Sequence, residues 1–179
     1  MSERIANRNT LALNAIKFAN LPFHGDTDEM GTNLKPIIDL FPRWNLKDAN
    51  NAWCSAFVYY CLVMTGFEIP YSPKECLTCS LAGCGGFEEF AMFNKEIEYY
   101  KAKDNFLPNV GDIVLYDKVF LDKEHDHIGI IVGTNENILI VAEGNIKGTN
   151  TSGIIERKID NHIRAYIRIP NGFKYKYGA

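Results

Sequence analysis

The feature that most constrains this sequence is a change in its hydrophobic pattern near Pro108 and Gly111. Before these residues, apolar side chains recur at the three- and four-residue spacing of amphipathic helices, and after them they form short runs typical of β-strands. The segments between the predicted strands are too short for crossover helices, so neighbouring strands are expected to run antiparallel. Helices followed by strands favour an α+β fold, in which N-terminal helices pack on an antiparallel sheet.

Capping and breaking residues set the bounds of the predicted elements. A helix over 10–21 is stopped by Pro22, and a second helix over 51–64 begins at Asn51, a common cap residue. The stretch 22–50 is expected to be irregular, because glycines and prolines interrupt it. The other expected elements are a helix over 87–100 and strands over 112–116, 127–132, 138–144 and 163–169.

Length and charge narrow the class of protein. With 179 residues, the chain is long enough for one domain with a substantial core and too short for two. We therefore expect a single domain over 1–179, with its motif-bearing core at about 50–170. The net charge of −3 gives no indication of a nucleic-acid partner.

Apolar runs such as 138–142 are far shorter than the roughly 18 residues of a transmembrane helix, so we expect no membrane span. We also expect a monomer.

Five cysteines supply candidates for chemistry, and their odd number leaves at least one thiol unpaired. Cys54 lies at the third position of the predicted second helix, where the helix dipole and unpaired N–H groups lower the pKa of a thiol. It is therefore a candidate nucleophile. The alternative is that Cys54 is a small buried apolar residue, as Cys61 is expected to be.

A histidine and a carboxylate are predicted to face each other on adjacent strands. If the strands on either side of Asn135 pair around a turn centred there, His127 lies directly opposite Glu143. A carboxylate in that position fixes the imidazole tautomer and stabilises the imidazolium. Asn145 is expected on the same strand face. The alternatives are an ordinary surface ion pair and, for the base, His125, although His127 lies nearer the sheet.

A cysteine at a helix start, followed by a strand histidine and a carboxylate, is the layout of papain-like cysteine hydrolases. The sequence resembles the CHAP domains, cysteine, histidine-dependent amidohydrolases and peptidases that cut bacterial peptidoglycan. Four segments carry the resemblance: WCSAFV at 53–58, PNVGDIV at 108–114, DHIGIIVG at 126–133 and EGN at 143–145. Their order and spacing are more specific than any one of them alone.

The resemblance implies a papain-like α+β fold and a catalytic set of Cys54, His127 and Glu143, with Asn145 close by. The implied substrate is peptidoglycan, cut by an N-acetylmuramoyl-L-alanine amidase or by an endopeptidase acting within the stem peptide. The related NlpC/P60 cell-wall endopeptidases usually carry a second histidine where this chain has Glu143, so the carboxylate favours CHAP. Two alternatives stay open: an amidohydrolase or toxin acting on another amide, and a catalytically silent scaffold that binds glycan or protein.

Two candidate metal sites are incomplete. Cys76, Cys79 and Cys84 include the spacing of a zinc knuckle, but they lack a fourth ligand. Some phage members of the family carry a calcium-binding acidic cluster, and the nearest counterpart here is the turn at 26–31. It has methionine at a ligand position and Ile37 where an EF-hand would have its closing glutamate. We expect no metal and no cofactor.

The N-terminal segment does not have the pattern of a secretory signal. Glu3 and Asn7 lie where a basic end and an apolar stretch would be expected. We expect synthesis in the cytoplasm and action at the cell wall after lysis-type or non-classical release. The roughly 30 residues after Asn145 are too few for a wall-binding repeat, so targeting to the wall is not explained.

Overall fold

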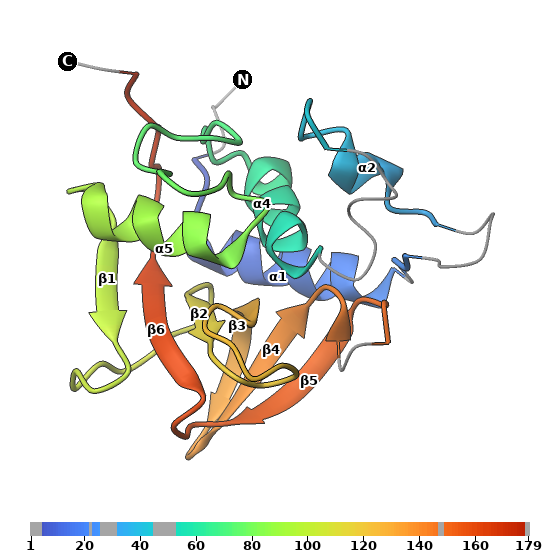
Figure 1. The fold of residues 1–179 in the computed structure, drawn as a ribbon. Helices are drawn as coiled ribbons and strands as arrows, with labels where there is room; N and C mark the ends of the chain where they lie inside the picture. Colours follow the sequence, from blue (N-terminus) through green and yellow to red (C-terminus); the bar gives the residue numbers. More distant parts are fainter. Residues whose placement is uncertain (1–4, 22, 26–31, 45–52, 147–148, 178–179) are drawn as a thin grey trace.

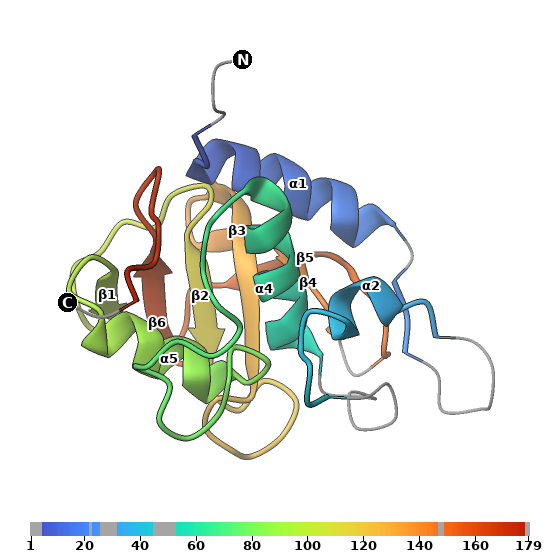
Figure 2. The ribbon, with the colours of Figure 1, turned by 90° about the horizontal axis from the view of Figure 1, so that it is seen from above.

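The computed structural model describes residues 5–21, 23–25, 32–44, 53–146 and 149–177. Within them, six strands form one antiparallel sheet in the order β1-β6-β2-β3-β4-β5. Helices α1, α4 and α5 lie on one face of this sheet (Figures 1 and 2). The α+β fold with helices packed on an antiparallel sheet is therefore confirmed.

The described helices and strands have the following bounds. The helices are α1 (Arg8–Asn20), α2 (Lys35–Ile38), α4 (Cys54–Thr65) and α5 (Cys84–Phe93). The strands are β1 (Glu98–Lys101), β2 (Ile113–Tyr116), β3 (His127–Asn135), β4 (Ile138–Glu143), β5 (Gly153–Lys158) and β6 (Ile163–Arg168).

Two predicted segments differ from the observed ones. The segment 87–100 was predicted as one helix, but α5 ends at Phe93, and Glu98–Lys101 pairs with β6 as strand β1. Two tyrosines favour this strand, and pairing with a distant segment overrides the local helical pattern. The stretch 22–50 was predicted to be irregular, but it contains the short helix α2. Pro36 lies in the first turn of α2, where proline removes no helical hydrogen bond.

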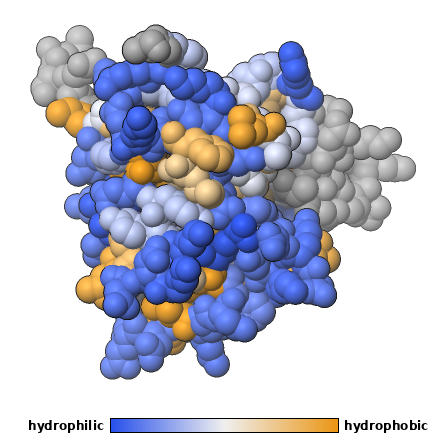
Figure 3. Space-filling model, turned by 60° about the vertical axis from the view of Figure 1, so that its left-hand side comes forward, coloured by the Kyte–Doolittle hydropathy of each residue, from blue (hydrophilic) through white to orange (hydrophobic). Residues whose placement is uncertain are grey.

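The two faces of the sheet carry different apolar clusters. In β2, Ile113 and Leu115 belong to the main core beneath the helices, whereas Val114 and Tyr116 belong to a smaller cluster on the other face. The side that carries β1 and α5 is mainly hydrophilic, with small separate hydrophobic patches (Figure 3). None of the helices in the described ranges is long and apolar enough to cross a membrane.

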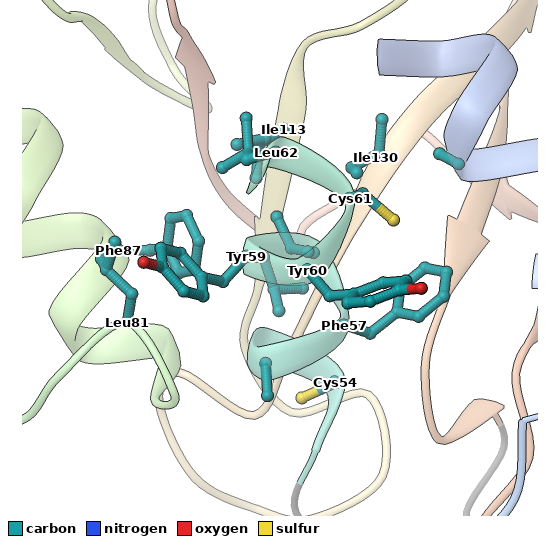
Figure 4. Close-up of a cluster of buried hydrophobic side chains, with 14 of the residues drawn as sticks. Cys54, Phe57, Tyr59, Tyr60, Cys61, Leu62, Leu81, Phe87, Ile113 and Ile130 are labelled. Atoms are coloured by element: carbon teal, nitrogen blue, oxygen red, sulfur yellow. The ribbon is translucent and has the colours of Figure 1, made fainter. Parts of the chain in front are cut away.

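Helix α4 forms the centre of the main core. All of its residues from Cys54 to Leu62 are buried, as expected for a helix that is apolar on every side. Figure 4 shows Tyr59 directed toward Leu81 and Phe87 on one side, with Tyr60 on the opposite side. The burial of α4 on all sides fixes the place of Cys54, its first residue.

The PNVGDIV segment joins α1 to the sheet. Gly111 has a φ of +84°, and a Cβ atom there would lie 2.3 Å from the backbone oxygen of Arg8. Buried Asp112 accepts hydrogen bonds from Arg8 Nη1 at 2.9 Å and from Arg168 Nη2 at 2.7 Å. This motif therefore has a structural role: it holds the start of α1 against strands β2 and β6.

Candidate active site

Cys54 is the first residue of α4, rather than the third residue of a helix capped by Asn51. The preceding Trp53 provides no side-chain cap, so the N–H groups of the first turn are available to other acceptors. One of them, the N–H of Ser55, donates to the Cys54 sulfur. The Ser55 hydroxyl donates to the carbonyl of Leu81 at 3.2 Å, which fixes this helix start against the loop before α5.

His127 and Glu143 interact, but not through the predicted register. The hairpin pairs Asn135 with Ile138 around a two-residue turn, and a bulge at Val132 then shifts the pairing. The last pair between the two strands is Ile130 with Ala142, and one further step of this register places Gly129 opposite Glu143. His127 is therefore a diagonal neighbour of Glu143 rather than a direct one. Beyond the bulge the register differs from the predicted one by two residues, an even number, and therefore both side chains stay on one face.

Gly129 leaves space for this diagonal contact. A Cβ atom on Gly129 would lie 2.8 Å from Cγ of Glu143. Glu143 therefore extends over the glycine, and its Oε2 atom lies 2.8 Å from Nε2 of His127. Because a carboxylate only accepts hydrogen bonds, Nε2 is the donor, and Nδ1 is the nitrogen left for the Cys54 thiol.

Arg157 holds the other side of the Glu143 carboxylate. Its Nε donates to Oε1 at 2.8 Å and its Nη2 donates to Oε2 at 2.7 Å, in a bidentate pair. The guanidinium group also lies over the rings of Tyr116 and Phe120, at 5.4 and 5.3 Å from their centroids. Arg157 was not predicted as part of the site, because the strand that carries it, β5, was not predicted. The alternating pattern of GIIERK at 153–158 was the available signal.

For both His127 and Glu143, burial favours the neutral form, whereas nearby charges and hydrogen bonds favour the charged form. Burial alone would lower the pKa of His127, but the charge of Glu143 and hydrogen bonds to Cys54 and Glu143 raise it to about 9. Burial opposes ionisation of Glu143, yet the charge of His127 and the hydrogen bonds of Arg157 and His127 keep its pKa below the ordinary value. The geometry therefore favours an imidazolium beside a carboxylate.

The pKa values of the buried cysteines also depend on whether a hydrogen bond or a charge opposes the effect of burial. The strongest influence on the pKa of Cys54 is a hydrogen bond from Cys84, which lowers this pKa. Burial raises the pKa, whereas the hydrogen bond and the charge of His127 lower it further. The pKa of Cys54 therefore lies well below the ordinary value for a thiol. In contrast, burial raises the pKa of Cys61, seven positions along the same helix, as expected for an inert buried thiol. Burial also raises the pKa of Cys76 to about 12.

Asn145 lies in the same cleft as His127, and its described hydrogen bond positions a loop. Its Oδ1 accepts from the N–H of Asn150 at 3.0 Å, and Asn150 Oδ1 accepts from the indole Nε1 of Trp53 at 2.7 Å.

Strand β4 ends at Glu143 and Asn145 has a φ of +55°, so the predicted alternation along one strand face does not extend to Asn145. A Cβ atom on Gly144 would lie 2.7 Å from the Trp53 ring. The EGN motif thus connects the sheet to the residue before Cys54.

Cys54 and His127 line one open cleft with a volume of about 750 Å³. Four aromatic side chains also line it: Phe41, Trp44, Tyr71 and Phe120. Within the described part of the chain, no group of three or more His, Cys, Asp or Glu side chains is arranged to hold a metal ion. The acidic turn at 26–31 lies outside the described residues.

These features define an α+β domain in which a thiol and an imidazole share one cleft. The model of the CHAP domain family matches residues 46–145, more than half of the chain, and the chain belongs to this family. CHAP domains are hydrolases of the amidase or peptidase type.

Comparison with solved structures agrees on the fold. The crystal structure of Ly7917 is similar, with a TM-score of 0.50 and 13% sequence identity, over 90% of this chain and 62% of that chain. At this identity the likeness shows the fold alone, and this chain spans less than two thirds of the length of that relative. Comparison with curated proteins finds no match.

Replacing Arg157 with methionine is expected to lower kcat about tenfold, because hydrogen bonds to a charged group contribute about 1.5–3 kcal/mol and hold Glu143 in place. The acid limb of the pH profile should move to higher pH. Without Arg157 the pKa of Glu143 rises, and a protonated Glu143 no longer favours the His127 imidazolium that stabilises the Cys54 thiolate. Steady-state assays across pH measure both effects. The variant Arg157→Lys should show smaller changes, and Lys158→Met, on the neighbouring exposed position, should show none. Unchanged kinetics in a folded Arg157→Met protein would exclude this positioning role.

Proposed function

We propose that this protein hydrolyses an amide bond of peptidoglycan, with Cys54 as nucleophile, His127 as acid and base, and Glu143 as the carboxylate that orients His127. The observation that carries the proposal is the placement of His127 between the Cys54 thiol and buried Glu143 at the edge of the cleft. Asn145 acts as a positioning residue through its contact with the Asn150 loop. The reaction uses no metal or cofactor, and the protein acts as a monomer at the cell wall.

The mechanism follows from the charges at this site. The Cys54 thiolate attacks the scissile carbonyl carbon, and the carbonyl oxygen takes up the negative charge. The N–H groups at the start of α4 stabilise that charge. His127 donates its proton to the departing amine, which leaves a thioester on Cys54. A water molecule, deprotonated by His127, then hydrolyses the thioester and regenerates the thiol.

Analysis of digested cell wall tests the substrate and the bond. Purified peptidoglycan is incubated with the protein, and the products are identified by mass spectrometry. An amidase releases stem peptides with a free N-terminal alanine and leaves glycan chains without peptide, whereas an endopeptidase releases shortened or uncrosslinked muropeptides. If neither kind of product forms, the substrate is another amide or the protein is a scaffold.

Alkylation separates an enzyme from a catalytically silent scaffold. Iodoacetamide at pH 6 should label Cys54 first, because its pKa is lowered, although its side chain is buried. Exposed Cys79 is the internal control for accessibility. Preferential labelling of Cys79, with Cys54 unreacted, would favour the scaffold.

Activity is expected to follow a bell-shaped dependence on pH. Below the lowered pKa of Cys54 the thiolate is protonated, so activity rises with pH through that value. Above about 9 His127 loses the proton that it must give to the leaving amine, so activity falls. Measuring kcat/KM from pH 4 to 10 checks both limbs. Activity that still rises between pH 9 and pH 10 would show that the imidazolium is not required.

A further inference from the structure

A second buried thiol lies next to the proposed nucleophile, and the proposed reaction gives it no covalent step. The sulfur of Cys84 is 3.9 Å from the sulfur of Cys54. The two residues are 7% and 8% exposed, and both line the open cleft. A small oxidant that enters the cleft therefore meets two thiols in contact.

The two cysteines lie at the starts of two helices, and their sulfurs must come closer together to form a bond. Cys54 is the first residue of α4 and Cys84 is the first residue of α5. A disulfide needs a sulfur separation of about 2.05 Å, so the sulfurs must move about 2 Å closer together. Gly86, in the first turn of α5, packs on the loop before the helix, where a Cβ atom would lie 2.3 Å from the carbonyl oxygen of Ser80. The approach therefore falls to rotation of the Cys54 and Cys84 side chains rather than to a shift of this turn.

We propose that Cys54 and Cys84 are a redox pair that a hydroperoxide converts into a disulfide, which reversibly blocks the nucleophile. The inference rests on the proposed role of Cys54. Cys54 is the thiol that reacts first, because His127 and the helix start favour its thiolate. Cys84 is the resolving thiol, since it is the cysteine whose sulfur contacts that of Cys54.

The chemistry balances with one hydroperoxide. The Cys54 thiolate attacks one peroxide oxygen and the O–O bond breaks, which gives a sulfenic acid and, with a proton, one water or alcohol. The Cys84 sulfur then attacks the Cys54 sulfur. The S–S bond forms, the S–O bond breaks, and the hydroxide leaves as water with the proton of Cys84. Two thiols lose two electrons in total and the hydroperoxide gains them.

Disulfide mapping of the whole protein tests the pair. The reduced protein is treated with equimolar hydrogen peroxide at neutral pH, its remaining thiols are blocked with N-ethylmaleimide, and its peptides are analysed without reduction. We expect a cross-linked peptide that joins Cys54 and Cys84. Activity toward peptidoglycan should fall to below about a tenth and return when dithiothreitol is added. A Cys54 that ends as sulfinic acid, or joined to another cysteine, overturns the inference.

Two variants provide the matched comparison. In Cys84→Ser no resolving thiol is present, so two or more equivalents of peroxide should drive Cys54 through sulfenic acid to sulfinic acid, one peroxide for each step, and dithiothreitol should not restore activity. Cys79→Ser removes the exposed thiol beside Gly83 and should keep the reversible block. Full recovery in Cys84→Ser, or loss of reversibility in Cys79→Ser, contradicts the pairing.

The mapping is independent of activity, so the two proposals fail separately. An active enzyme without the Cys54 to Cys84 cross-link overturns the redox pair and leaves the hydrolase intact. A cross-linked protein that shows no hydrolysis in its reduced state overturns the proposed hydrolase instead.

Discussion

Replacing Cys54 with alanine is expected to abolish hydrolysis, with kcat reduced by about three orders of magnitude or more, because removal of a covalent nucleophile leaves only binding and oxyanion stabilisation. The fold should persist, since alanine is small and apolar and Cys54 is the first residue of a buried helix. Turnover of purified peptidoglycan measures the loss, and thermal unfolding checks the fold.

The matched control is Cys61→Ala in the same helix. Cys61 is fully buried and its pKa is raised by burial, so it resembles Cys54 in surroundings but not in reactivity. This variant should lose some stability and keep its rate per folded molecule. If Cys54→Ala kept more than about a tenth of the wild-type activity, Cys54 would not be the nucleophile.

Local patterns were sufficient to predict the layers of the fold. Apolar spacing and a final proline predicted α1, and short connections after Gly111 predicted an antiparallel sheet, which the strand pairing confirms. Local patterns failed where a distant segment decides the structure. Glu98–Lys101 is a strand because β6 lies beside it, and that partner lies more than sixty residues further along the chain.

The candidate site shows the same division. The chemical types of Cys54, His127 and Glu143 were visible in the sequence, but the bulge at Val132 was not, because it depends on how two strands twist together. The predicted face was correct because the error in register was even. Arg157 belongs to no motif, and the spacing of Cys84 suggested only an incomplete metal site. Both residues reach the candidate site through the packing of β5 and α5, so sequence spacing alone could not place them there.

Replacing His127 with alanine is expected to cost nearly as much as the loss of Cys54, because nucleophile and base act as one unit and their effects are not additive. Glu143→Gln should cost less, at about a hundredfold. In the wild type, Oε2 of Glu143 accepts from both His127 and Arg157 Nη2. An amide oxygen at that position can still hold the imidazole ring, but it cannot stabilise the charge of the ring.

The pH profile separates this electrostatic role from simple positioning. Glu143 is a principal reason that the pKa of His127 is raised to about 9. Without the negative charge the imidazolium loses its proton at lower pH, so the alkaline limb of Glu143→Gln should move toward neutrality. A carboxylate that only oriented the ring would leave that limb in place while lowering kcat. An unmoved alkaline limb in Glu143→Gln would therefore reduce Glu143 to a structural support, whereas a shifted limb identifies it as the group that keeps His127 charged until the proton is needed.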